Sequence, residues 1–309
     1  MEDVAHQPHS AENFGEERNF WWNDDFLELI RRRLAFPEAH SLVDVGCGQC
    51  HWTAIATELF PAVESVTGVD FEAAWVEGAE AAYRLRLERQ GRVPSASLRF
   101  VQGNAHALPL PDASADVVTC QTVLMHLARP AEAVAEMFRV VRPGGLVMVA
   151  EPENSLNFIR LDTAAMAMSL DELTAIYRFR TAIHLGRAAR GSDWDIGHRL
   201  VGMLEQAGGV EVQVYTSDRV NACAPPYASA IQRASIAAEA AWGALMDTDS
   251  PTRRNHEAWA RDGGLGADEI AYGFALETKV RAVRKSQVAA GTWHHGGGFI
   301  QYIAWARRG

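Results

Sequence analysis

The feature that most constrains the fold is an alternation of short apolar runs with helical segments, which begins near residue 41. Such alternation predicts βαβ units, and therefore a parallel sheet with helices on both faces. We expect strands at 41–45, 65–69, 97–101, 115–120, 146–150, 210–215 and 299–306, and helices at 20–34, 53–59, 73–88 and 130–141. The sequence thus predicts an α/β fold with a doubly wound, seven-stranded, Rossmann-like sheet.

The same pattern divides the chain into three parts. Residues 1–40 form a polar tail and an amphipathic helix, which we interpret as an N-terminal helical arm or lid. Residues 41–217 together with 298–309 form the expected core. Residues 218–297 are mostly helical and rich in alanine and aromatic residues, so they are expected to be a helical insertion before the last strand. This insertion is either a cap over a substrate or a dimer interface.

The loop after the first strand favours one kind of cofactor. Gly46 and Gly48 let the backbone approach a ligand closely, because glycine has no Cβ. A dinucleotide-binding loop needs glycine or alanine where this chain has His51. Asp44 precedes the first glycine, where a carboxylate would repel a pyrophosphate and attract an ammonium group. S-adenosylmethionine has an ammonium group and no phosphate, so the loop favours this methyl donor over NAD.

Several motifs occur in the order typical of one family. The loop resembles D-x-G-x-G-x-G, with Cys50 in place of the last glycine. Asp70 ends the second strand, and Gly103-Asn104-Ala105 follows the third. The run from Leu108 to Val118 and the segment Arg139-Val140-Val141-Arg142-Pro143-Gly144-Gly145-Leu146 complete the pattern. Between residues 42 and 151 the chain resembles the class I S-adenosylmethionine-dependent methyltransferases, in the small-molecule, ubiquinone-biosynthesis-like (type 11) subgroup.

This resemblance implies a cofactor site and the direction of one strand. In the family the last strand is antiparallel, Asp70 accepts hydrogen bonds from the ribose hydroxyls, and Asn104 accepts one from the adenine amino group. The expected cofactor-binding residues are Asp44, Gly46, Cys47, Gly48, Asp70, Phe71, Gly103, Asn104, Ala105, Gln121, Thr122 and His126. We expect no metal, because Cys47 and Cys50 fall inside the cofactor loop.

Two residues are candidates for catalysis. Methyl transfer is an in-line displacement, and it needs a general base only when the acceptor must lose a proton early. His126 follows the fourth strand and is the first candidate for this base. It could instead pack over the cofactor or help to bind the methionine carboxylate. Glu151 follows the fifth strand and could act as a base, anchor an amine, or have a purely structural role.

Residues expected to contact the substrate come from three segments at the carboxyl edge of the sheet. Trp21 and Trp22 are adjacent on the predicted arm, and we expect that they cannot both face the core. Asp193, Trp194 and His198 precede the sixth strand, and His294 with His295 precedes the seventh. Core packing of the arm and an inert loop at the histidines are the alternatives. The histidine pair has no third ligand at a spacing typical of a metal site.

Composition narrows the class of partner. A net charge of −10 argues against a surface that binds nucleic acid. No apolar run reaches the ~20 residues that span a membrane, and alanine with arginine indicates a GC-rich bacterium. We therefore expect a cytoplasmic bacterial methyltransferase that acts on a small molecule, with O- or N-methylation preferred and a homodimer as one assembly. An RNA or protein methyltransferase and a non-catalytic S-adenosylmethionine-binding protein are the alternatives.

Overall fold

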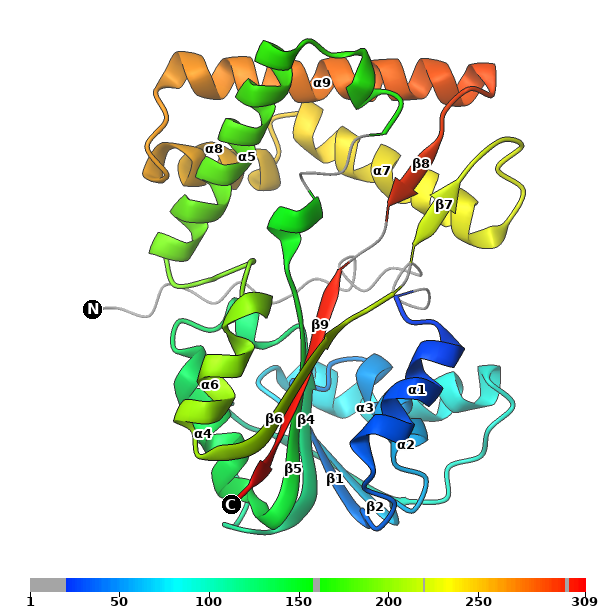
Figure 1. The fold of residues 1–309 in the computed structure, drawn as a ribbon, viewed down its shortest axis with the longest axis vertical. Helices are drawn as coiled ribbons and strands as arrows, with labels where there is room; N and C mark the ends of the chain where they lie inside the picture. Colours follow the sequence, from blue (N-terminus) through cyan, green and yellow to red (C-terminus); the bar gives the residue numbers. More distant parts are fainter. Residues whose placement is uncertain (1–20, 158–161, 219, 298–299) are drawn as a thin grey trace.

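The computed structural model describes residues 21–157, 162–218, 220–297 and 300–309, and these residues form a sheet-based core and a helical layer (Figure 1). The sheet of the core has seven strands in the order β3-β2-β1-β4-β5-β9-β6. They are β1 (Ser41–Val45), β2 (Ser65–Asp70), β3 (Ser97–Gln102), β4 (Ala115–Gln121), β5 (Val141–Pro152), β6 (Gly209–Thr216) and β9 (Gln301–Arg308). The predicted Rossmann-like architecture is confirmed.

Strand direction places the ligand-binding edge of the sheet. The strands β1 to β5 pair in parallel, and β9 lies antiparallel between β5 and β6, which confirms the expected antiparallel last strand. The order of the strands reverses between β1 and β4, and in doubly wound sheets ligands bind beyond the carboxyl ends at such a switch point. These carboxyl ends point toward the helical layer in Figure 1.

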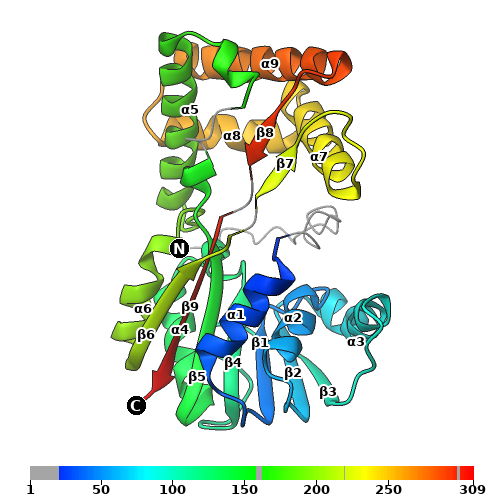
Figure 2. The same ribbon diagram turned by 45° about the vertical axis from the view of Figure 1, so that its right-hand side comes forward.

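Helices cover both faces of the sheet (Figures 1 and 2). One face packs against α1 (Asp24–Leu34), α2 (His51–Leu59) and α3 (Ala73–Arg89), and the other against α4 (Pro130–Val140) and α6 (Leu200–Gln206). Because both faces are covered, all seven residues of β4 are buried.

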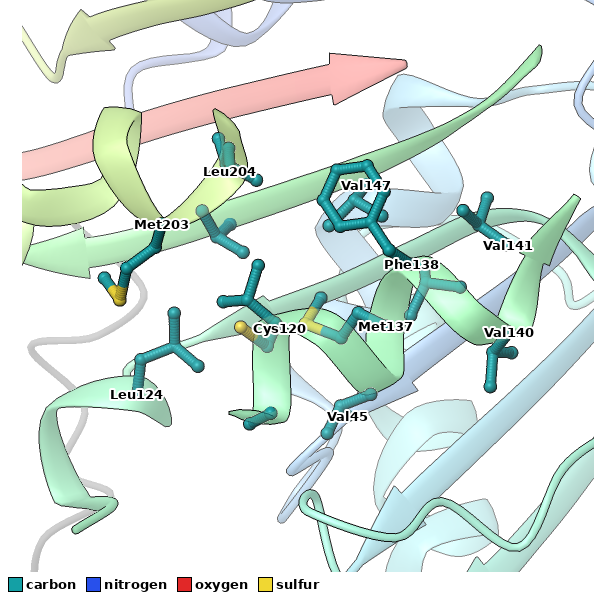
Figure 3. Packing of buried hydrophobic residues seen from close by; sticks show 14 of the residues in the cluster. Val45, Cys120, Leu124, Met137, Phe138, Val140, Val141, Val147, Met203 and Leu204 are labelled. Atoms are coloured by element: carbon teal, nitrogen blue, oxygen red, sulfur yellow. The ribbon is translucent and has the colours of Figure 1, made fainter. Parts of the chain in front are cut away.

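Successive residues of β4 show how the two faces are filled. The Thr119 hydroxyl accepts a 2.8 Å hydrogen bond from the indole of Trp52 on one face. On the other face, Cys120 packs in a cluster with Met137 and Leu204 (Figure 3). Burying one large apolar side chain contributes roughly 1.5–3 kcal/mol, so these two clusters fix the sheet that positions the site.

The helical layer contains α5 (Leu170–Ala189), α7 (Ala230–Asp247), α8 (Pro251–Asp262) and α9 (Ala267–Ala290). Phe179 of α5 and Phe274 of α9 meet edge to face, with ring centroids 4.8 Å apart. A Cβ at Gly186 of α5 would lie 1.8 Å from the carbonyl oxygen of Trp259 in α8. The backbones of α5 and α8 therefore touch, which only glycine permits at this position.

The extent of the helical layer differs from the expected insertion. The predicted boundaries put α5 in the core, but its buried face packs against α7, α8 and α9, because its glycine and phenylalanine contacts lie there. The ribbon of β7 (Asn221–Cys223) and β8 (His295–Gly297) joins the layer to the core strands.

Short 3-10 helices are η3 (Leu124–His126), η4 (Asn154–Asn157), η5 (Ala165–Ala167) and η6 (Gly197–Arg199). No helix in the described ranges is long and apolar enough to cross a membrane.

The arm departs from prediction at its two tryptophans. Trp21 and Trp22 are both buried in the cluster between α1, α2 and the sheet, so the expectation that one of them faces away from the core is wrong. Helix α1 begins only at Asp24. The side chains of Trp21 and Trp22 therefore project from a bend before the helix and not from one helical turn. Trp22 lies between Phe26 and Trp52, with ring centroids 5.9 and 5.6 Å away. Residues 1–20 of the predicted arm lie outside the described residues.

Candidate functional site

The glycine loop after β1 is fastened to the end of β2. The N–H groups of Gly46 and Cys47 donate to the carbonyl oxygen of Val69 at 2.7 and 3.1 Å. The N–H of Gly48 donates to Oδ2 of Asp70 at 2.8 Å. Gly46 and Gly48 have φ angles of +72° and +46°, a backbone conformation that residues with a side chain rarely adopt. The loop and the acid predicted from sequence are thus one hydrogen-bonded unit.

Gly46 also brings the loop against the turn after β4. A Cβ built at Gly46 would lie 2.4 Å from Cγ2 of Val123. Real Cβ atoms are essentially never so close to another heavy atom. The glycine therefore permits an approach between the ends of β1 and β4, which are neighbouring strands.

Asp70 has the geometry expected of an acceptor. Its carboxylate is 9% exposed, and Oδ1 accepts from the N–H of Glu72 at 3.0 Å while Oδ2 accepts from Gly48. Each carboxylate oxygen can accept a further hydrogen bond. Phe71 follows and is 52% exposed. Its carbonyl oxygen accepts from Gln102 at 2.9 Å, which fixes the backbone beside the acid.

Two buried polar atoms at this edge have no hydrogen-bond partner among the residues that the structure describes. Oδ2 of Asp44 accepts a 2.5 Å hydrogen bond from Thr53, but Oδ1 has no donor. The amide nitrogen of Gln121, at the end of β4, has no acceptor. Burial raises the pKa of Asp44 to about 7, against the effect of the Thr53 hydrogen bond. An unsatisfied buried acceptor and donor indicate that a ligand completes this edge.

Glu151 is buried beneath the turn after β4, whereas a general base has to face the substrate. Its carboxylate is fully buried at the end of β5 and accepts the N–H groups of Val123 and Leu124 at 2.8 Å and of Met125 at 3.3 Å. Burial raises its pKa to about 7, and these backbone donors act in the opposite direction. We therefore correct the catalytic role expected of Glu151 to a positioning role, because its oxygens bind the η3 turn and are not exposed to a ligand.

His126 ends this turn and is half-buried. Its position follows from the Glu151 contacts, since the three N–H groups immediately before it bind one carboxylate. Thr122 begins the same turn with φ +52°, an uncommon conformation for a residue that is not glycine. The structure thus brings Gln121, Thr122 and His126 to the end of β4, opposite Gly46. The proton-transfer role of His126 stays a prediction.

The segment after β3 is tightly packed around its predicted residues. A Cβ at Gly103 would lie 2.5 Å from Pro109 and 2.8 Å from Val69, so glycine is needed beside the end of β2. Oδ1 of Asn104 accepts from the N–H of His106 at 2.9 Å and lies 3.0 Å from its Nδ1. This oxygen, which we expected to bind adenine, therefore already has a partner within its own loop. Ala105 lies half-buried between them. Contact of Asn104 and Ala105 with adenine stays a prediction.

The rim before β6 is held by two acids, Glu153 and Asp195. Glu153 accepts from the backbone N–H of His198 at 3.0 Å and lies 2.9 Å from its Nδ1. Asp195 lies 2.6 Å from Nδ1 of His184 and accepts from the N–H of Ser155 at 2.6 Å. In the sequence, the pattern Glu151-Pro152-Glu153 at the end of a strand indicates that both acids belong to this edge, because alternate residues of a strand face the same side.

Asp193 and Trp194, the other predicted residues of this rim, contact different parts of the molecule. Asp193 pairs with Arg199 at 2.7 Å. The carbonyl oxygen of Trp194 accepts from the side chain of Asn154, directly after β5, at 2.8 Å. Its indole ring lies under the guanidinium of Arg187, 3.9 Å from the centroid, and thus faces the helical layer. Trp194 and His198 therefore contact the segment directly after β5, whereas Asp193 pairs with Arg199. Contact of these three residues with substrate stays a prediction.

The histidine pair lies in the helical layer. His294 is exposed, and its Nδ1 is 3.0 Å from the carbonyl oxygen of Thr292. His295 stacks on the buried ring of Trp293, with centroids 5.4 Å apart and planes at 9°. It lines a cavity of about 260 Å³ together with Asp162 of the segment after β5 and residues of α5, α7 and α9. Contact with substrate stays a prediction for both histidines. Within the described ranges, no group of three or more His, Cys, Asp or Glu side chains could hold a metal ion.

Comparisons with known proteins agree with this geometry. Residues 43–149, from within β1 to within β5, match a family model described as a methyltransferase domain. These residues form a class I S-adenosylmethionine-dependent methyltransferase domain of the type 11 group. The matched segment contains the glycine loop, Asp70, Asn104 and Gln121, and it excludes the helical layer.

Three relatives illustrate the similarity. A probable S-adenosylmethionine-dependent methyltransferase of Mycolicibacterium smegmatis is 34% identical over 143 residues, which are 46% of this chain and 49% of that protein. A demethylmenaquinone methyltransferase of Geobacillus is 30% identical over 134 residues, 43% of this chain and 53% of the other. The chain thus spans about half the length of these curated relatives. The solved structure of YcgJ from Bacillus subtilis is 17% identical, with a TM-score of 0.47, and covers 93% of this chain and all of that one.

The residues at the sheet edge fit S-adenosylmethionine. Oδ1 of Asp44 lacks a donor and would suit the ammonium group, and the amide nitrogen of Gln121 lacks an acceptor. The carboxylate of Asp70, fixed by two backbone N–H groups, keeps capacity for hydroxyl donors.

Proposed function

We propose that this protein transfers a methyl group from S-adenosylmethionine to a small-molecule acceptor held between the carboxyl edge of the sheet and the helical layer. The observation that supports it most directly is the unit formed by the glycine loop and Asp70, with the unsatisfied atoms of Asp44 and Gln121 beside it. When bound, S-adenosylmethionine supplies an electrophilic methyl group on a sulfonium.

The residues of the chain have separate tasks in this proposal. Asp70 accepts hydrogen bonds from ribose hydroxyls, and Asp44 in its ionised form attracts the ammonium group. His126, on the turn fixed by Glu151, accepts the proton that an O–H or N–H acceptor loses as the new bond to the methyl carbon forms. The helical layer and the rim at Trp194 exclude water from the acceptor.

We favour O- or N-methylation, for which a base at His126 has a function. A second candidate is C-methylation of a quinol-type ring, because relatives that match the core are named demethylmenaquinone methyltransferases. Methylation of RNA or protein and binding of the cofactor without transfer remain the alternatives. A cytoplasmic location in a bacterium, the absence of nucleic-acid and membrane partners, and a homodimer stay predictions.

The test is to incubate the full chain with methyl-labelled S-adenosylmethionine and separate pools of phenols, amines, quinols, tRNA and unfolded protein. We expect label in a small-molecule pool, accompanied by stoichiometric S-adenosylhomocysteine. Label in RNA or protein would contradict the proposal. Tight cofactor binding with no transfer to any pool would support the non-catalytic alternative instead.

A further inference from the structure

The helical layer encloses a cavity of about 200 Å³ that lies outside the family-matched segment. Its wall includes Phe179 of α5, Trp242 of α7, His256 of α8 and Phe274 of α9, and it is completed by Trp194. Rings therefore approach the cavity from four helices and from the rim. An apolar cavity of about 150 Å³ holds benzene, so this one has room for a single ring with a substituent.

His256 gives this aromatic cavity one specific polar group. It is 5% exposed, and Nδ1 lies 2.8 Å from the carbonyl oxygen of Thr252, one helical turn earlier. Nδ1 therefore holds the proton, and Nε2 is an acceptor. Burial lowers the pKa of His256 to about 4, so the ring is neutral near pH 7. Among the described residues, none donates a hydrogen bond to this Nε2.

Most polar groups on the wall around His256 have partners. Arg180 pairs with Glu277 at 2.5 Å, and Arg281 pairs with Asp247, although Nε of Arg281 has no hydrogen-bond partner among the described residues. His184 lies 2.6 Å from Asp195. The wall near His256 is aromatic: the rings of Trp259, Trp242 and Trp194 lie with centroids 4.9, 5.5 and 6.1 Å from the imidazole. A ligand for this space needs a flat apolar body and a hydrogen-bond donor.

Trp194 connects this cavity to the rim of the candidate site. Its ring lines the cavity, while its backbone carbonyl binds Asn154 at the end of β5. The neighbouring residue Ser192 donates to the carbonyl oxygen of Met125 at 2.8 Å, next to His126. One short segment thus forms a wall of the cavity and borders the turn with the predicted base.

We propose that this cavity binds the planar ring of an aromatic acceptor, on which an O–H or N–H group other than the one to be methylated donates a hydrogen bond to Nε2 of His256. The identity of this ring as the acceptor rests on the proposed methyl transfer; its binding in the cavity does not. Trp194 then lies between the bound ring in the cavity and the carboxyl edge of the sheet, where the methyl group is transferred. The imidazole is a specificity residue, since it favours rings with a donor over rings without one.

The experiment compares 4-methylphenol with toluene, two probes of similar size that differ in the donor. Binding to the full chain without cofactor is measured by equilibrium dialysis and by quenching of tryptophan fluorescence. We expect 4-methylphenol to bind at least about tenfold more tightly than toluene, which corresponds to about one hydrogen bond. Equal affinities, or no binding of either probe to folded protein, would overturn the proposal.

Two variants locate the effect. His256→Phe keeps an aromatic ring and removes the acceptor, so both probes should bind with equal affinity. Ile183→Trp fills the cavity from α5 and should abolish binding of both. Circular dichroism and a calorimetric titration with S-adenosylhomocysteine are recorded on each sample. Cofactor binding without probe binding would reject this inference alone, and probe binding without cofactor binding would reject the proposed function alone. A preference for 4-methylphenol that persists in folded His256→Phe would also overturn the inference.

Discussion

The backbone N–H of Gly48 donates a 2.8 Å hydrogen bond to Oδ2 of Asp70, joining the loop after β1 to the end of β2. The two residues are 22 positions apart in the sequence, yet each positions the other. The acid orders the glycine loop, and the loop directs the remaining acceptor capacity of the acid toward the crevice.

Replacing Asp70 by asparagine should weaken cofactor binding strongly. The amide puts a donor where a carboxylate oxygen accepts from Gly48 or Glu72, and it removes an acceptor for the ribose hydroxyls. Hydrogen bonds to charged groups contribute about 1.5–3 kcal/mol, so we expect affinity for S-adenosylhomocysteine to fall at least about tenfold in calorimetry.

Asp116 offers a matched control at the opposite edge of the sheet. Its Oδ2 accepts the N–H groups of His40 and Ser41 at 2.8 Å, at the start of β1. Asp116→Asn should lower stability while leaving affinity for S-adenosylhomocysteine within about twofold. Equal losses of affinity in both variants would show that Asp70 acts through general stability.

Gly46→Ala should cost more stability than an alanine at another left-handed glycine. Gly144 has nearly the same φ, +74° against +72°, but a Cβ there would meet nothing within 4 Å. Gly144→Ala should lose about 1–2 kcal/mol from backbone strain alone. Gly46→Ala adds the contact with Val123, which costs about 1–3 kcal/mol more. Urea unfolding of both variants measures the difference, and indistinguishable midpoints would refute the close approach of loop and turn.

Stability should fall as pH rises, in part through Glu151. Its pKa in the folded state is raised to about 7 from a usual value of 4.5, so the folded state binds the proton more tightly than the unfolded state. Its contribution is full below about pH 4.5 and is lost as pH rises through 7. Asp44, also raised to about 7, acts in the same direction.

Glu151→Gln should remove its share of this pH dependence. Between pH 5 and pH 8, one such group lowers the free energy of unfolding by on the order of 3 kcal/mol. Urea unfolding at the two pH values should therefore give a smaller difference for the variant than for the original chain. A difference as large as that of the original chain would mean that Glu151 does not titrate in this range.

His126→Gln should separate binding from chemistry. If the imidazole accepts a proton from the acceptor, kcat should fall about 100-fold or more, measured by release of S-adenosylhomocysteine with the acceptor found in the labelled pools. Affinity for the cofactor should fall less than tenfold. An unchanged kcat with a large loss of affinity would instead place His126 against the methionine carboxylate.

Local patterns were sufficient to predict the core. The strand expected at 65–69 is Ser65–Asp70, and the helix expected at 130–141 is Pro130–Val140. Such elements have strong apolar periodicity and short connections, so their partners lie nearby in sequence. Asp70 and Gly46 were identified for the same reason, because their chemistry depends on position at a strand end.

Long-range packing accounts for what sequence analysis missed. Gly186 touches the backbone of Trp259, and His256 meets Trp194 across the helical layer. These pairs are separated by about sixty to seventy residues, and nothing in either segment alone indicates its partner. Sequence analysis left the role of Glu151 open between catalysis, amine binding and structure, because a buried carboxylate that binds three backbone N–H groups has the same sequence signature as a catalytic one.

The most direct test of methyltransferase function at this edge is a calorimetric titration of the full chain with S-adenosylmethionine and S-adenosylhomocysteine, with NAD as the comparison. We predict one binding site per chain for both sulfur ligands, with a dissociation constant between about 1 μM and 1 mM, and no heat from NAD. A folded sample that gives no binding to either sulfur ligand at about 1 mM would contradict the account.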